Sequence, residues 1–500
     1  MTAVSSTDSR PALWLAPEFA PEPAHVELAH QPMDIVFDPA VRRAVRGCHE
    51  FAMRRISDGG QVYGATTGFG PMVKFAGREQ ASDQCDNALA HLGAGQGEDL
   101  PAEVVRGAML VRLWSLCRAR SGASVGVVDA LAAALRTGFA PAVPRLGSLG
   151  ASGDLIPLSY IARALRGEGA AYLDGARMAA SAALAFAGLT PLDLDGRDAL
   201  ALVNGTSLTA AAAALAIRSL ERSCTAALHL TALLAGRLDC TDAFTEPELL
   251  DVFRHPGAAE AGKQLRTLMN GGGSGVGRPL QEPYSIRCVP QLVGAAADAL
   301  RSAENTVRTD LRSVSDNPLF FPEKDLVAHG GNFFGQPIAF AADQMNTVAV
   351  QLANLAERQL DLLIDPNRNG GLPPMLASDP GRQHGMQGVQ LAATAMVAAM
   401  RRAAMPASMQ SLPTNWHNQD VIPFGTQAAL TALDQARLLR LVHGCLAVSL
   451  RQAAYVGQPA QTSNTLLDEL CERIEPVAVD RPLDEDVRRA ADLLDAHLSR

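Results

Sequence analysis

Aromatic residues are scarce in this sequence, and its cysteines are not clustered. Phe, Trp and Tyr together make up 5% of the 500 residues, whereas Ala and Leu are abundant, a composition that suits helices packed closely through small side chains. The eight cysteines stand singly, at positions 48, 85, 117, 224, 240, 288, 445 and 471. Because no CxxC pair and no Cys/His ligand spacing occurs, the sequence favours free thiols in a reducing compartment over a disulfide framework or a structural zinc site.

The sequence also lacks an excess of positive charge and a targeting segment. Its net charge of −9 offers no basic field for a polyanion, so we expect no nucleic-acid partner. The N-terminus has no basic stretch followed by an apolar one, as a secretory signal would. No uninterrupted apolar run of membrane-spanning length is evident. We therefore expect a cytoplasmic protein with no membrane partner.

The pattern of residues changes along the chain. Residues 1–30 are rich in Pro, Ser and Glu without periodicity, which predicts a flexible arm. Short helical patterns and glycine-rich turns follow, with little strand-like alternation. After about residue 195 the segments are long, Ala/Leu-rich and mostly free of Pro, near 205–237, 289–315, 337–364, 384–405 and 425–457. We predict a mainly α protein, in which a long-helix bundle follows a smaller N-terminal α(+β) region.

The most informative of the glycine-rich turns is GSLGASGD, from Gly147 to Asp154. Taken alone, this string indicates a structural turn, an anion-binding nest or the approach to a serine nucleophile. The hydrolase pattern GxSxG is not met, because no residue separates Ser152 from Gly153.

The longer string GASGDLIPLSYIA resembles the signature of the aromatic amino acid ammonia-lyase and aminomutase family. In that family an Ala-Ser-Gly tripeptide, here Ala151, Ser152 and Gly153, cyclises and dehydrates to 4-methylideneimidazol-5-one (MIO). The amide nitrogen of Gly153 must reach the carbonyl carbon of Ala151, an approach that a side chain on Gly153 would hinder. Ser152 supplies the hydroxyl that leaves, and Asp154 is expected to help hold the strained loop.

The resemblance extends over roughly residues 38 to 460, because further family motifs follow in the family's order. These are YGATTGFG at Tyr63–Gly70, NGT at Asn204–Thr206, QEPYSIRC at Gln281–Cys288, SDNP at Ser315–Pro318, GNF at Gly331–Phe333 and NQD at Asn418–Asp420. The resemblance implies the ammonia-lyase fold, which is like that of fumarase and aspartase. Its MIO-bearing domain would span 31–200 and its long-helix bundle 201–500.

The resemblance also assigns the catalytic side chains. Tyr63 is identified as the base, and a phenol needs a lowered pKa to remove a proton near neutrality. Arg287 lies three residues after Tyr284, so on a helical turn the two would share a face, with Arg287 gripping the substrate carboxylate through paired hydrogen bonds. Without the resemblance, Tyr63 would be a packed loop aromatic and Arg287 a surface arginine.

The remaining site residues are polar side chains and one aromatic. By resemblance, Asn204 contacts the MIO or the amino group and Asn317 assists with the carboxylate, although either could simply cap a helix. Gln281 and Gln419 are interpreted as hydrogen-bonding groups of the pocket, and Phe333 as a pocket wall. The family implies no metal and no external cofactor. It implies a homotetramer whose active sites combine loops from three chains.

Two positions bear on the substrate. The pair that reads the substrate ring is His91-Leu92 here, as in tyrosine lyases, where phenylalanine lyases tend to carry Phe-Leu and histidine lyases Ser-His. A histidine can hydrogen-bond a para-hydroxyl, although it could also merely complete a helix face. Histidine lyases carry a glutamate where this chain has Gln419. L-tyrosine, converted to trans-p-coumarate, is therefore the leading substrate.

Several alternatives remain open. DOPA and phenylalanine are possible secondary substrates, and histidine is a weaker alternative. A 2,3-aminomutase would share every motif above, and a catalytically silent scaffold is disfavoured because Ser152, Tyr63 and Arg287 are intact. Two stretches are not typical of tyrosine lyases and could reshape the ring pocket: Val421–Phe424 and Phe334.

Overall fold

The chain forms two compact units in a computed structural model that describes residues 10–78, 80–457 and 464–498. Unit 1 comprises Met1–Leu215, Glu304–Asp343 and Pro406–Leu430, and unit 2 comprises Ala216–Ala303, Gln344–Met405 and Thr431–Arg500. The chain passes between the units five times. Four passages lie within long helices, α9 (Ser207–Arg237), α13 (Val289–Arg312), α14 (Gln336–Ile364) and α16 (Gly425–Val456), and the fifth lies at Met405–Pro406. The expected boundary near residue 200 therefore falls inside unit 1, which also takes up two later segments.

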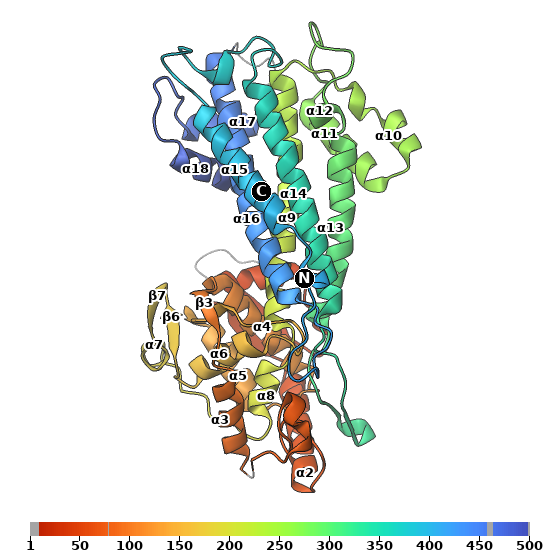
Figure 1. Ribbon diagram of the computed structural model, residues 1–500, viewed down its shortest axis with the longest axis vertical. Coiled ribbons are helices and arrows are strands. Elements are labelled where there is room, and N and C mark those ends of the chain that lie inside the picture. Colours follow the sequence, from red (N-terminus) through yellow and green to blue (C-terminus); the bar gives the residue numbers. More distant parts are fainter. Residues whose placement is uncertain (1–9, 79, 458–463, 499–500) are drawn as a thin grey trace. The chain divides into compact units, whose positions relative to one another are not determined.

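Unit 1 is built from short helices with small sheets at its margins (Figure 1). Its helices are α1 (Pro23–Glu27), α2 (Pro39–Ser57), α3 (Ala81–His91), α4 (Ala102–Cys117), α5 (Val125–Leu135), α6 (Leu155–Leu165), α7 (Ala180–Phe186) and α8 (Asp198–Val203). Helix α2 begins where the Asp38 carboxylate accepts a hydrogen bond from the amide of Ala40, with Pro39 as its first residue. Helix α4 is buried on every side from Val104 to Leu116, so it forms the core of this unit.

The sheets of unit 1 are short. Strands β1 (Ala12–Leu15) and β2 (Asp34–Phe37) pair in parallel. Antiparallel pairs join β3 (Gln96–Asp99) to β5 (Pro144–Leu146) and β8 (Leu319–Phe321) to β9 (Leu326–Ala328). A three-stranded sheet has the order β4 (Phe139–Pro141), β6 (Ala170–Leu173), β7 (Ala176–Ala179). The mainly α prediction with a minor β component is confirmed.

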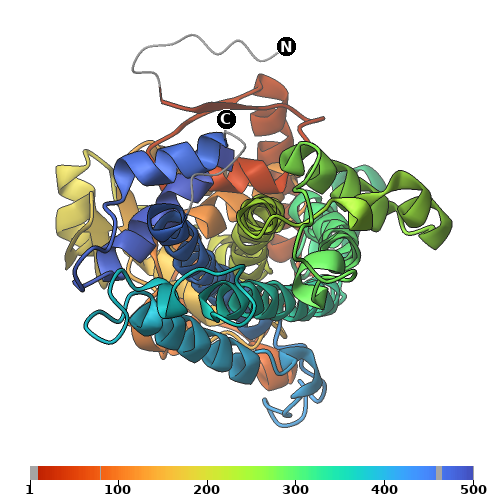
Figure 2. The same ribbon diagram turned by 90° about the horizontal axis from the view of Figure 1, so that it is seen from above.

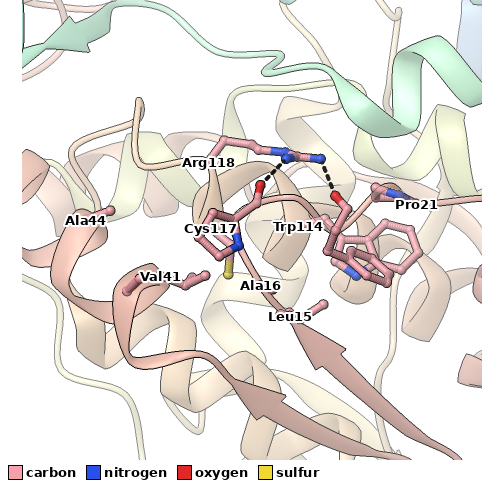
Figure 3. A pocket seen from close by; sticks show the side chains of 11 residues that line it. Leu15, Ala16, Pro21, Val41, Ala44, Trp114, Cys117 and Arg118 are labelled. Atoms are coloured by element: carbon pink, nitrogen blue, oxygen red, sulfur yellow. Dashed lines mark hydrogen bonds between the residues drawn. The ribbon is translucent and has the colours of Figure 1, made fainter. Parts of the chain in front are cut away.

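The N-terminal segment is not the flexible arm that its composition predicts. Residues 1–9 lie outside the described part of the chain, but from Ala12 onward the segment is folded. The physical reason is an alternation within β1, in which Leu13 and Leu15 are buried while Trp14 is 58% exposed. Arg118 adds two hydrogen bonds, to the carbonyl oxygens of Pro17 (3.3 Å) and Phe19 (2.8 Å), beside a cavity of about 150 Å³ (Figure 3).

Unit 2 is a bundle of long helices. The unit-2 parts of α9, α13, α14 and α16 run side by side with α15 (Gln387–Ala403), and Figure 2 looks along their axes. The shorter helices of this unit are α10 (Pro247–Phe253), α11 (Pro256–Met269), α12 (Tyr284–Arg287), α17 (Thr465–Arg473) and α18 (Asp484–Leu498). The five long segments predicted from the sequence correspond to α9, α13, α14, α15 and α16, which confirms the predicted long-helix bundle.

One helical stretch among the described residues, Asp198–Arg237, is long and apolar enough to cross a membrane by length and composition. This stretch differs from the expectation that no apolar run of membrane-spanning length occurs. Its most apolar window is 94% buried within the protein, as in the core helix of a folded domain. The burial arises because Ala and Leu occupy nearly every turn of α9 and pack against neighbouring helices.

Candidate active site

The Ala151-Ser152-Gly153 tripeptide lies at the turn before α6, in unit 1. Gly153 has a φ of +72°, a conformation that favours glycine. A Cβ atom on Gly153 would lie 2.4 Å from the amide nitrogen of Gly205, so the two backbones touch. The next residue continues this contact, since the amide of Asp154 donates to the Gly205 carbonyl at 2.7 Å. The expected need for glycine at position 153 therefore has a second physical reason in the close approach of Gly205.

Ala151 is buried in a small apolar cluster with Ile422 and Phe424. The amide of Phe424 donates to the Leu149 carbonyl at 3.0 Å, which ties this segment to the tripeptide loop. These two residues belong to the stretch Val421–Phe424 that departs from the family pattern. In this chain the departure supports the tripeptide through contact with Ala151.

Gln419 reaches the tripeptide directly, because its side-chain amide donates a hydrogen bond to the Ser152 hydroxyl oxygen. The turn that presents it is unusual. Asn415, Trp416 and His417 all have a left-handed backbone, with φ values of 52°, 53° and 61°. Such a run is costly for residues other than glycine and is typical of functional sites. The prediction that Gln419 is a hydrogen-bonding group of the site therefore has a named partner.

Tyr63 lies in the loop after α2, with its hydroxyl oxygen accepting a hydrogen bond from the amide of Gly70 at 2.7 Å. Burial raises the pKa of Tyr63, an effect that the Gly70 amide and the positive charge of Arg197 oppose. A lowered pKa was expected of a base, so the free chain differs from that expectation. A Cβ atom on Gly70 would lie 4.0 Å from the Asn415 side chain, so the Tyr63 loop borders the turn that presents Gln419.

His91 joins the same site through an aromatic contact. The ring of Phe69 stacks on His91 with 5.5 Å between centroids and meets Tyr63 edge-on at 6.4 Å. The Nδ1 of His91 lies 2.8 Å from the carbonyl oxygen of Asn87, a group that can only accept. The Nδ1 atom therefore carries the hydrogen, which leaves Nε2 as an acceptor. Leu92 is buried beside it at 9% exposure.

Asn204 and Asn317 are brought together, since the side-chain amide of Asn204 donates to the Asn317 carbonyl at 2.9 Å. Asn204 is 3% exposed, and its Oδ1 has no hydrogen-bond partner within the part of the chain that the structure describes. The Oδ1 of Asn317 accepts from the amide of Gly330 at 2.8 Å. An unpartnered buried acceptor is costly, so Asn204 fits a donor supplied by a ligand.

Phe333 is half-buried and lies in the loop before α14. Two residues later the amide of Gly335 lies 3.4 Å from the carbonyl oxygen of Gly150. The loop that carries Phe333 is thereby attached to the tripeptide loop. This position is compatible with the predicted role of Phe333 as a pocket wall.

Gln281, Tyr284 and Arg287 belong to unit 2, whereas the other predicted site residues belong to unit 1. Tyr284 and Arg287 share a face of α12 as predicted, with the guanidinium 4.7 Å from the centre of the Tyr284 ring. The Nε of Arg287 donates to the Glu282 carbonyl at 2.9 Å. Tyr284 is 72% exposed and Gln281 is also exposed.

Helix α12 is held by Gln359, a buried polar residue of α14. Gln359 is 1% exposed, and its side-chain amide donates to the Ser285 carbonyl (2.9 Å) and the Thr231 hydroxyl (2.7 Å). Both partners are in unit 2. Gln359 is therefore a buried polar anchor for the Tyr284–Arg287 turn.

The structure adds residues that the sequence did not single out. Phe69 links the rings of Tyr63 and His91, and it stood in a recognised motif without an assigned role. Ser148, Thr209 and Thr426 all donate to the buried carboxyl group of Asp154. Ser148 could have been found from its place in the motif, but Thr209 and Thr426 carry no local signal. All eight cysteines are free thiols. Across residues 10–78, 80–457 and 464–498, no group of three or more His, Cys, Asp or Glu could hold a metal ion.

Comparison with known proteins identifies the class. Residues 23–475 match the aromatic amino acid lyase family, and the chain belongs to this family of carbon–nitrogen lyases. The chain is 37% identical to tyrosine ammonia-lyase of Cereibacter sphaeroides, covering 91% of this chain and 92% of the relative. It is 34% identical to histidine ammonia-lyase of Symbiobacterium thermophilum, over 94% of each chain. The crystal structure of tyrosine aminomutase from Streptomyces globisporus has a TM-score of 0.89 at 30% identity, over 96% of each chain.

Proposed function

We propose that this chain eliminates ammonia from L-tyrosine to give trans-p-coumarate, using an MIO group made from Ala151-Ser152-Gly153. The choice of tyrosine rests on which ring nitrogen of His91 carries the hydrogen. Its Nδ1–H is held by the Asn87 carbonyl, so Nε2 can accept a hydrogen bond from the para-hydroxyl of a substrate ring. The adjacent Leu92 and Phe69 supply apolar contact for such a ring.

The residues around the tripeptide fit an MIO group. Gly153 is pressed against Gly205, and the Asp154 carboxyl is anchored, so the tripeptide is held in one conformation. When formed, the MIO supplies an electrophilic methylidene carbon for the amine of the substrate. The unpartnered Oδ1 of Asn204 is the acceptor that an amine N–H would satisfy.

Tyr63 is the group that removes the β-proton. Its hydroxyl oxygen already accepts the Gly70 amide, a hydrogen bond that favours the phenolate. Because burial raises the pKa of Tyr63 in the free chain, we infer that further positive charge at the site must lower it when substrate is bound.

Arg287 is the group that binds the substrate carboxylate. The family resemblance implies a homotetramer with shared active sites, so we propose that Arg287, Tyr284 and Gln281 reach each site from a neighbouring subunit. Asn317 assists at the same carboxylate. The eight free thiols support a reducing, cytoplasmic location for this assembly.

The test of the reaction is product analysis with the purified enzyme. We expect L-tyrosine to yield p-coumarate faster than L-phenylalanine yields cinnamate, and L-histidine to be the poorest substrate. The intact mass of the denatured chain should be lower than the sequence mass by two water molecules, and the Ser152→Ala variant should keep its full mass and be inactive. An unmodified wild-type mass would remove the electrophile from the proposal.

The test of substrate choice is His91→Phe. We expect the ratio of kcat/KM for tyrosine over phenylalanine to fall by about tenfold or more, because a hydrogen bond of about 1.4 kcal/mol is lost. His30→Phe is the matched control, since the Nδ1 of His30 also lies close to a main-chain carbonyl oxygen, 2.6 Å from that of Glu27, and is exposed. An unchanged ratio in His91→Phe would overturn the role of His91.

A 2,3-aminomutase is the second candidate, favoured by the high TM-scores against tyrosine and phenylalanine aminomutases. This enzyme would return the amine to the β-carbon. Chromatographic separation of p-coumarate from β-tyrosine distinguishes the two reactions. Accumulation of β-tyrosine alone would replace the lyase proposal with the mutase.

A further inference from the structure

Asp154, which directly follows the tripeptide, is surrounded by hydroxyl groups. Its Oδ1 accepts hydrogen bonds from Ser148 (2.8 Å), Thr209 (2.8 Å) and Thr426 (2.7 Å). Its Oδ2 accepts the amide of Thr209 at 2.9 Å. All four side chains are buried, with exposures of 0–6%. We call Ser148, Thr209 and Thr426 the hydroxyl ring.

The hydroxyl ring joins three separate parts of unit 1. Ser148 lies in the loop before α6, Thr209 in the first turn of α9 and Thr426 in the first turn of α16. Thr426 contacts every other member of this cluster. Besides its hydrogen bond to Asp154, its Oγ1 lies 2.6 Å from the Ser148 hydroxyl and 2.9 Å from the Thr209 hydroxyl. A burial this complete leaves no water to replace a lost partner.

The number of hydrogens shows how tightly the ring is coupled. Each hydroxyl has one hydrogen, so three hydrogens are shared among five oxygen–oxygen contacts. Burial raises the pKa of Asp154, an effect that the hydrogen bonds from Thr209, Thr426 and Ser148 oppose. Removal of one hydroxyl therefore disturbs several contacts at once.

The hydroxyl ring closes the tripeptide into a loop. Ser148 and Asp154 lie on either side of residues 149–153, and their side chains are hydrogen-bonded to each other. Ser148 also accepts the amide of Gly150 at 3.1 Å. At the other end, the Asp154 amide is fixed to the Gly205 carbonyl. Both ends of Ala151-Ser152-Gly153 are thus attached to the same buried cluster.

We propose that Ser148, Thr209 and Thr426 are positioning residues for the formation of the MIO, setting the rate at which the tripeptide cyclises. This inference rests on the proposed function. In the reaction the Gly153 nitrogen bonds to the Ala151 carbonyl carbon. The carbonyl oxygen leaves as water with the amide hydrogens of Gly153 and Ser152. The Ser152 hydroxyl leaves as a second water with the Ser152 α-hydrogen.

The ring contributes no atom to this reaction. It restricts the tripeptide before the reaction, so less conformational freedom is lost on reaching the bond-forming geometry. A ring of hydroxyls suits this task, because its hydrogen bonds are directional and join segments that meet only after folding. Its effect should therefore be on the rate of maturation, and a mature molecule should work normally.

The test follows maturation by the intact mass of the full chain after cell-free synthesis. Thr426→Val keeps the shape of the side chain and removes the hydroxyl, and we expect its loss of two waters to be about tenfold or more slower than in the wild type. Thr426→Ser restores the hydroxyl and should restore the rate. Thr245→Val is the matched control, a buried threonine of unit 2 whose hydroxyl donates to the Asp242 carbonyl.

A second variant keeps the proposal testable if Thr426→Val does not fold. Ser148→Ala should also mature slowly, whereas Ser449→Ala, which removes another fully buried hydroxyl, should not. For each slow variant, activity should track the matured fraction with an unchanged KM. Folded Thr426→Val and Ser148→Ala that mature at the wild-type rate would overturn the inference. A wild type that never loses the two waters would instead overturn the proposed function.

Discussion

The two units differ in what lies in their interiors. Unit 1 buries charged groups that pair with one another, the deepest being Arg112, Arg197 and Asp316, whose side chains are at most 1% exposed. Asp316 lies 2.8 Å from Arg197 and 3.5 Å from Arg112. Arg106, which is 2% exposed, donates five hydrogen bonds to main-chain carbonyls, which uses every N–H that its guanidinium has.

The interior of unit 2 is filled by long helices, whose buried side chains are mostly apolar. Two of its buried carboxylates pair with arginines that reach toward the surface, Glu357 with Arg358, which is 57% exposed, and Asp486 with Arg481, which is 31% exposed. A third, Glu282, pairs with Arg278, which is 11% exposed. A helix satisfies its own backbone hydrogen bonds, whereas loops need side chains to do so. We infer that the buried charged residues of unit 1 fix the irregular segments that contribute to the site, such as Ser315–Pro318.

The largest expected effect concerns one residue from each unit, Ser152 and Arg287. Ser152→Ala in unit 1 should abolish activity, and Arg287→Met in unit 2 should lower kcat/KM by about 10- to 100-fold through the loss of a charge-assisted hydrogen bond. If sites are shared between subunits, co-expression of the two variants creates sites with both residues intact. About a quarter of the sites in a random mixture would then be wild type.

The measurement is the kcat/KM of purified mixed assemblies carrying two different affinity tags. The control is a mixture of the two variants assembled separately, which should show no recovery. Activity equal to the average of the two variants would mean that each chain supplies both residues to the same site.

The second effect tests the buried charges of unit 1. Asp316→Asn leaves Arg112 and Arg197 without their carboxylate, which should lower the free energy of unfolding by about 3–5 kcal/mol. Asp34→Asn is the control, because the Asp34–Arg136 pair is 39% and 54% exposed and should contribute at most about 1 kcal/mol. Urea unfolding followed by circular dichroism measures both. Equal losses of unfolding free energy in the two variants would show that the buried charges of unit 1 contribute no more than an exposed ion pair.

The third effect tests the apolar interior of unit 2. Leu352 on α14 is fully buried, so Leu352→Ala should cost about 2–5 kcal/mol through lost burial and a residual cavity. Activity per folded molecule should not change. Leu391→Ala on α15, where the side chain is 66% exposed, should cost less than about 0.5 kcal/mol. A comparable loss at Leu391 in unfolding experiments would show that another subunit covers this side chain.

The same contrast explains what the sequence could predict. The helices of unit 2 were predictable because apolar residues recur at three- and four-residue steps, as from Ile338 to Leu355 in α14. The tripeptide and the residues around it were predicted through the resemblance of their motifs to those of a known family, since the string GSLGASGD taken alone also suits a structural turn or an anion-binding nest. Thr209 and Thr426 were not, because each lies in a helical segment that gives no sign of a buried partner. Their role exists only once three distant segments meet at Asp154.

The N-terminal segment and the division into units show the same limit. Composition predicted a flexible arm over residues 1–30, yet four residues with alternating burial were enough to form β1. A strand pattern of only four residues is hard to recognise within a segment that is rich in proline. The return of Glu304–Asp343 and Pro406–Leu430 to unit 1 depends on tertiary contacts alone, so no local pattern could reveal it.

The smallest expected effect is the response of unit 2 to acid. His443 in α16 is 2% exposed, and its Nε2 has no hydrogen-bond partner among the described residues. Burial lowers its pKa from 6.5 to about 4, so the unfolded chain takes up a proton before the folded one does. The folded state is therefore not penalised by His443 above pH 6.5, and the free energy of unfolding falls as the pH falls from 6.5 toward 4.

His443→Gln cannot take up this proton, so its melting temperature should fall less than that of the wild type between neutral pH and about pH 5.5, by the equivalent of about 1 kcal/mol. His384→Gln is the control, since His384 is exposed and paired with Asp480. Melting curves across this pH range compare the three proteins. Parallel curves for the wild type and His443→Gln would show that acid acts at other groups.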